Sequence, residues 1–125
     1  MADILIAGGW DKDGNIVKSV ERFSWEKNVR ERVIPMNFCR KGATSFVYES
    51  QLFVAGGCDH HLIDVLDLNE GPHHYQWVAC MAIMPFCCKR TRSVVHQDRA
   101  ILFCACKTND CCAELSLTAP YECKQ

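Results

Sequence analysis

The chain has 125 residues, of which 49% are apolar, and its 14 lysine and arginine residues nearly balance its 15 acidic residues. That length suits one folded unit or a piece of one, and the apolar fraction is ample for a packed core. The near-neutral charge argues against a nucleic-acid binder, and no apolar run reaches the roughly 18 to 20 residues that would span a bilayer. No secretory signal precedes the first apolar run, so we expect a cytoplasmic protein.

The first predicted strand is Ile4 to Ala7, an apolar run that ends in the glycine pair Gly8-Gly9. A glycine pair after a strand indicates a turn that needs positive φ or a close approach of two backbones. The first strand is therefore expected to end abruptly, and a polar loop follows it.

The segment 19–34 can be interpreted in two ways. Trp25, Val29 and Val33 have helical spacing, which favours an amphipathic helix capped by Ser19. The internal repeat described below places two strands there instead, joined by a turn near residues 26–28. We follow the repeat.

The next predicted element is a hairpin. Phe46 to Tyr48 and Leu52 to Val54 are short β-prone runs separated by the polar residues 49–51, which suit a tight turn. Further strands are expected at 63–67 and 101–104.

A repeat of about 48 residues organises these elements. The run Ile-Leu-Ile-Ala-Gly-Gly at residues 4–9 returns as Leu-Phe-Val-Ala-Gly-Gly at 52–57, and a third copy at 101–106 carries Ala-Cys in place of Gly-Gly. Because four of the seven glycines lie in these two pairs, the match indicates repeated units.

Further residues recur in a fixed order. Ser-Val-Glu-Arg-Phe at 19–23 is followed by Pro35-Met36 and Arg40, and Trp77 is followed by Met84-Pro85 and Lys89-Arg90. In this order, the elements resemble the kelch repeat, and most closely that of the BTB-kelch adaptor proteins, over residues 4–106 and more weakly over 107–125. The chain departs from the family at Arg30, where a Trp is usual, in the missing third glycine pair, and in a longer turn at 70–75.

The resemblance implies an all-β fold, an incomplete kelch β-propeller made of four-stranded antiparallel blades. We assign residues 1–36 to a partial blade, 37–84 to a complete blade and 85–125 to a partial, degenerate blade with two or three strands. The apolar runs 4–7, 52–55 and 101–104 are then expected to be covered on both faces. Closed propellers have about four to eight blades, so we expect a fragment of a longer propeller.

The resemblance also implies a binding module and not an enzyme, with no cofactor. It points to the substrate-recognition part of a cullin-RING ubiquitin ligase adaptor, whose BTB and linker domains, which would hold the cullin, are absent from these 125 residues. The alternatives are an actin-associated kelch protein and a piece of a propeller enzyme. The sequence contains neither a G-x-S-x-G elbow nor a phosphate-binding glycine loop.

The loops on one face of such a propeller would bind a protein ligand such as an acidic peptide. The candidate contact residues are Trp10, Asp11, Arg40, Asp59, His60, Lys89 and Arg90. An exposed Trp is a plausible anchor, and guanidinium groups grip carboxylates in bidentate fashion. The alternatives stay open: Trp10 could fold back onto its own blade, the basic residues could be solvated loop residues, and the adjacent histidines could belong to an ordinary polar turn instead of a metal or proton-transfer site.

The ten cysteines leave three interpretations open: plain buried or surface thiols, a structural zinc site, and redox-reactive thiols. There is no C-x-x-C motif, and the histidine pairs lack the usual zinc spacing. We therefore expect thiols and no metal.

Overall fold

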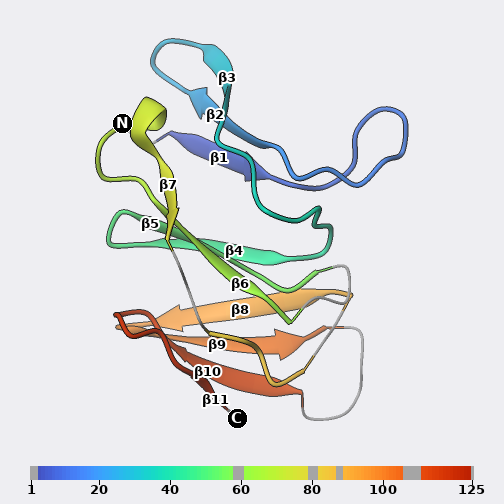
Figure 1. Cartoon of the computed structure of the whole chain (residues 1–125), viewed down its shortest axis with the longest axis vertical. Helices are drawn as coiled ribbons and strands as arrows, with labels where there is room; N and C mark the ends of the chain where they lie inside the picture. The colour runs from blue at the N-terminus through green and yellow to red at the C-terminus, as the bar shows by residue number, and fades with distance from the viewer. Residues whose placement is uncertain (1–2, 58–60, 79–81, 87–88, 106–110, 125) are drawn as a thin grey trace.

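The computed structural model of the chain describes residues 3–57, 61–78, 82–86, 89–105 and 111–124. These residues form an all-β structure with a single turn of 3-10 helix at Pro72–His74. The strands build three antiparallel sheets that follow one another along the long axis of the molecule (Figure 1). Over the described residues, no helix has the length and apolar character needed to cross a membrane.

The N-terminal sheet has three strands in the order β1 (Ile4–Ala7), β2 (Val20–Ser24) and β3 (Val29–Val33). Segment 19–34 is thus a hairpin, as the repeat predicted, and the alternative helix is wrong. In the hairpin Arg22 lies directly opposite Glu31 and forms an ion pair with it at 2.9 Å. Such cross-strand pairs stabilise neighbouring strands, which explains why the charged residues of this segment favour a hairpin.

The middle sheet has four strands in the order β4 (Thr44–Tyr48), β5 (Gln51–Ala55), β6 (Ile63–Asp67) and β7 (Gln76–Val78). The predicted hairpin of β4 and β5 is confirmed. Its two turn residues, Glu49 and Ser50, have φ of 47° and 61°, the positive values that a two-residue type I′ turn requires.

The C-terminal sheet has four strands in the order β11-β10-β9-β8. They are β8 (Thr91–His96), β9 (Arg99–Cys104), β10 (Cys112–Ser116) and β11 (Cys123–Lys124). The prediction of two or three strands after residue 85 is therefore wrong. The strand β11 has only two residues, too few to produce an alternating pattern in the sequence.

The core lies on both faces of the middle sheet. Leu52, Val54 and Leu66 pack with Val20 and Met36 on the side of the N-terminal sheet. On the other side, one cluster joins the middle and C-terminal sheets through buried residues that include Phe53, Ala55, Val65, Leu102 and Leu115.

Burial along the three apolar runs follows from this arrangement. Residues 52–55 are buried on both faces, as predicted. In the other two runs alternate side chains are exposed, and Ile4 and Ile101 keep 49% and 42% of their surface. The prediction of two covered faces is wrong for these runs, because each end sheet has a neighbour on one side only.

The cysteines differ from the expectation at one position. Cys104, at the end of β9, takes part in a disulfide. The expectation of thiols throughout is thus wrong there, while Cys39 and Cys112 are exposed free thiols.

Candidate protein-binding surface

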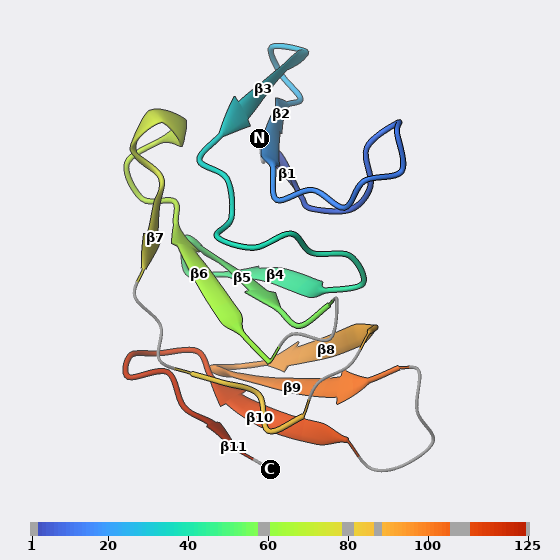
Figure 2. The same ribbon diagram turned by 45° about the vertical axis from the view of Figure 1, so that its right-hand side comes forward.

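The linker between the first two sheets is the segment from β3 to β4 in Figure 2. The glycine pair after β1 forms a turn that packs against this linker. The N–H of Gly8 donates to the carbonyl of Ser19 at 2.9 Å, and the N–H of Gly9 donates to the carbonyl of Arg40 at 2.7 Å. Gly8 has φ of +72°, and a Cβ there would lie 2.5 Å from the Arg40 carbonyl oxygen. Only glycine allows this approach, which seats the loop after β1 on the linker.

That loop is held in one conformation by its own hydrogen bonds. Trp10 and Ile16 form an antiparallel bridge at its base. The Asp11 carboxylate oxygen Oδ1 accepts from the N–H groups of Asp13 and Asn15, both at 2.9 Å. Asp11 therefore holds the loop in shape, a structural role that we did not predict when we named it as a candidate ligand contact.

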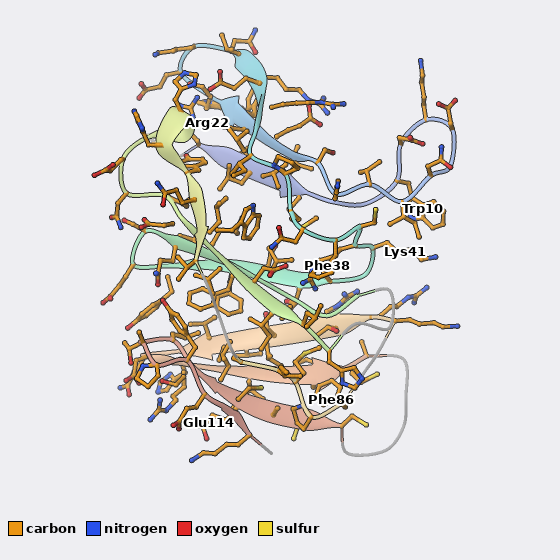
Figure 3. All side chains as sticks on the ribbon, viewed as in Figure 1. Trp10, Arg22, Phe38, Lys41, Phe86 and Glu114 are labelled. Carbon is orange, nitrogen blue, oxygen red and sulfur yellow. The ribbon has the colours of Figure 1, made fainter. Side chains whose placement is uncertain are left out.

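Trp10 is presented at the base of this loop with 59% of its surface exposed. The ammonium group of Lys41 lies 4.3 Å from the centre of its ring, a cation–π geometry. Figure 3 shows Trp10, Lys41 and Phe38 on the same side of the molecule. The exposed aromatic predicted at Trp10 is present, and its neighbour Lys41 was not predicted.

The structure contradicts the role predicted for Arg40, which was to contact an acidic peptide ligand. Only 1% of its side chain is exposed, and the guanidinium donates to the carbonyls of Gly56 at 2.6 Å and Leu62 at 3.1 Å. It also forms an ion pair with the Asp64 carboxylate at 2.8 Å. Arg40 thus ties the linker to the turn of the middle sheet, because its guanidinium donates to the Gly56 carbonyl and shares the Leu62 carbonyl with the N–H of Gly56. It cannot face a peptide in this conformation.

The linker that precedes the third sheet lies against the first linker. The N–H of Thr91 donates to the carbonyl of Gly42 at 2.8 Å, and Gly42, with φ of +73°, leaves no room for a Cβ beside the carbonyl of Lys89. Lys89 and Arg90 are exposed. We call Trp10, Lys41, Lys89 and Arg90 the basic-aromatic ridge.

A groove of about 970 Å³ adjoins the ridge at Trp10. Its lining includes the basic Lys12, Lys18 and Arg32, the acidic Asp11 and Asp13, and the Glu21–Arg30 ion pair. The hydrogen bond from Arg30, together with the positive charges of Arg30 and Arg32, lowers the pKa of the Glu21 carboxyl despite its partial burial. Basic and acidic side chains thus share the groove beside the ridge, with four basic residues against three acidic ones.

The remaining candidates, Asp59 and His60, lie outside the described residues. The next residue, His61, is exposed, and its Nδ1 lies 3.3 Å from the carbonyl oxygen of Met84. Within the described ranges, no group of three or more His, Cys, Asp or Glu side chains could hold a metal ion.

Comparison of the chain with models of known protein families finds no match. A search among curated proteins likewise finds no matching relative.

Proposed function

We propose that this chain is a protein-interaction module that binds an acidic peptide segment across the basic-aromatic ridge. The observation that carries the proposal is the exposed Trp10 ring with the Lys41 ammonium 4.3 Å from its centre. An aromatic anchor flanked by cations offers an apolar contact and charge-assisted hydrogen bonds to carboxylates.

The rigidity of the loop supports the same proposal. Binding costs conformational entropy when the contact residues must be ordered, and this cost is smaller when the free protein already holds them. Here the two hydrogen bonds to Asp11 and the bridge between Trp10 and Ile16 order the loop without a ligand.

The architecture that we propose is part of a kelch-type β-propeller. The repeat of about 48 residues, the glycine pairs with positive φ and the successive antiparallel sheets support it. By the resemblance to BTB-kelch proteins, the module would recognise the substrate of a cullin-RING ubiquitin ligase, with the cullin contacted by domains outside these residues.

A phage-displayed library of random 12-residue peptides tests the proposal without a known ligand. We expect the selected peptides to be enriched in Asp and Glu. For a selected peptide, Trp10→Ala should weaken binding about tenfold or more, the scale of a central interface residue. Reversing a ridge charge with Lys41→Glu should weaken binding as well, because it places a carboxylate against the acidic ligand.

Trp25→Ala is the matched control. Trp25 is 62% exposed in the turn between β2 and β3, where its ring meets Phe23 edge to face. Figure 1 shows that this hairpin end and the loop after β1 lie on opposite sides of the first sheet. Equal losses for Trp10→Ala and Trp25→Ala, or selected peptides without acidic enrichment, would refute the proposal.

A further inference from the structure

Positive charge is concentrated where the two linkers meet. Residues 38–43 of the first linker and residues 89–93, which lead into β8, contain five basic residues and no acidic residue. One of the five, Arg40, is buried, and Asp64 balances its charge. The other four are Lys41, Lys89, Arg90 and Arg92. The adjoining groove differs, because acidic residues offset most of its basic ones. The excess positive charge therefore lies at the contact between the linkers.

A contact between main chains brings these two segments together. The N–H of Thr91 donates to the carbonyl of Gly42 at 2.8 Å. The position that a Cβ of Gly42 would occupy is filled by the carbonyl of Lys89, and it lies 3.5 Å from the Cα of Arg90. The side chains of Lys89 and Arg90 are exposed, and Lys41 directly precedes the glycine at the contact. These three basic side chains therefore begin next to one another.

Neighbouring cations of this kind suit a group with more than one negative charge. Like charges that the fold holds together repel one another, and an anion bound among them relieves the repulsion. A carboxylate brings one charge and two oxygens, whereas a phosphoserine brings about 1.5 to 2 charges and three strong acceptor oxygens. The planar guanidinium of Arg90 matches the geometry of a phosphate, and the two ammonium groups add further donors. The chemistry therefore favours a phosphate over a carboxylate.

The cations also adjoin the aromatic anchor. Lys41 belongs to both, because its ammonium group lies 4.3 Å from the centre of the Trp10 ring and its main chain precedes the contact at Gly42 (Figure 3). Successive residues of an extended peptide are about 3.3 Å apart. A peptide with a phosphate at the linker contact would thus place a residue one or two positions away against Trp10. We expect that residue to be apolar, since it contacts an aromatic ring.

We propose that the ligand of the basic-aromatic ridge is a phosphorylated peptide. Its phosphoserine lies at the contact between the linkers, where Lys41, Lys89 and Arg90 hold the phosphate, and an apolar neighbour of the phosphoserine packs on Trp10. This inference rests on the proposed function, because it names the chemical class of the ligand that the same surface binds. An acidic peptide without a phosphate is then the weaker ligand.

Two peptide libraries provide the probe. Both contain random 12-residue peptides, one with a fixed phosphoserine at the centre and the other with a serine there. The immobilised full chain should retain the phosphoserine library, with apolar residues enriched within two positions of the phosphate. For the best peptide, fluorescence anisotropy should show that removal of the phosphate weakens binding about thirtyfold or more. Glutamate in place of the phosphoserine should restore only part of the affinity, because it carries one charge.

Variants of the chain locate the phosphate. Lys89→Gln and Arg90→Gln should each weaken binding of the phosphopeptide about tenfold, the scale of a lost charge contact, and change binding of the serine peptide by less than about threefold. Lys27→Gln is the matched control, because it removes one charge from the exposed turn between β2 and β3. It should leave both affinities unchanged. Circular dichroism checks that each variant is folded.

The outcomes separate this inference from the proposed function. Equal binding of phosphorylated and unphosphorylated peptides, or equal effects of Arg90→Gln and Lys27→Gln, would overturn the inference. Trp10-dependent binding of unphosphorylated acidic peptides would still leave the proposed function standing in that case. Displacement of the phosphopeptide by a hundredfold excess of inorganic phosphate would indicate a site for the phosphate ion alone, and it would overturn the inference too. If the chain binds neither kind of peptide, both proposals fail.

Discussion

Replacement of Arg40 by alanine should make the protein easier to unfold, although Arg40 lies in a linker between two sheets. The guanidinium is buried, and it supplies donors to two main-chain carbonyls and to the Asp64 carboxylate. Arg40→Ala removes these donors, although the Leu62 carbonyl keeps the hydrogen bond from the Gly56 N–H, and it empties the volume of a large side chain. The linker would then no longer be fastened to the turn at Gly56.

The magnitude follows from the environment of each acceptor. Breaking a buried ion pair costs about 3 to 5 kcal/mol when the remaining charge stays buried. Asp64 keeps 15% of its side chain exposed, so water can reach the carboxylate and the cost lies at the lower end of that range. We expect a loss of about 3 kcal/mol in the free energy of unfolding, and a drop of about 10 °C in the melting temperature.

Urea unfolding monitored by tryptophan fluorescence measures this loss directly. Arg40→Met serves as a second variant, because it keeps most of the volume and removes only the donors. Lys27→Ala, in the exposed turn between β2 and β3, is the control and should change stability by no more than about 0.5 kcal/mol. If Arg40→Ala unfolds at the same urea concentration as the parent chain, the buried role of Arg40 is refuted.

Two further changes test the turns and the ion pairs. Gly42→Ala should destabilise the protein more than Gly14→Ala in thermal unfolding, because both have positive φ but only Gly42 packs against a backbone carbonyl of the next linker; equal melting temperatures would contradict this packing. Acidification should remove the stabilising contribution of the Glu21–Arg30 pair, because folding lowers the pKa of Glu21. The contribution is complete above the pKa of the unfolded chain, 4.5, and it is lost as the pH falls through the lower pKa of the folded chain. In urea titrations, the free energy of unfolding should therefore decrease less between pH 6 and pH 3 for Arg30→Gln than for the parent chain. Identical decreases would exclude the pair as a source of pH dependence.

The strands of the first two sheets could be predicted because their signals are local. Alternation, turn residues and the repeated glycine pair act within a few residues of one another, and they identify β1, β4 and β5. The hairpin at residues 19–34 required the repeat as well, since Trp25, Val29 and Val33 alone have helical spacing. The third sheet was incomplete in the prediction because β11 has two residues and no pattern.

The direction of each side chain in the linkers was decided by the tertiary structure. Arg40 and Lys41 are adjacent and both basic, so the sequence cannot indicate which of them turns inward. Arg40 is buried because its guanidinium has partners inside the protein. These partners are the carboxylate of Asp64, 24 residues further along the chain, and two main-chain carbonyls of the middle sheet. Lys41 lies beside Trp10 because the turn at Gly8 seats the loop on the same linker. A buried charge requires partners that neutralise it, and only the packing of one sheet on the next brings those partners within hydrogen-bonding distance.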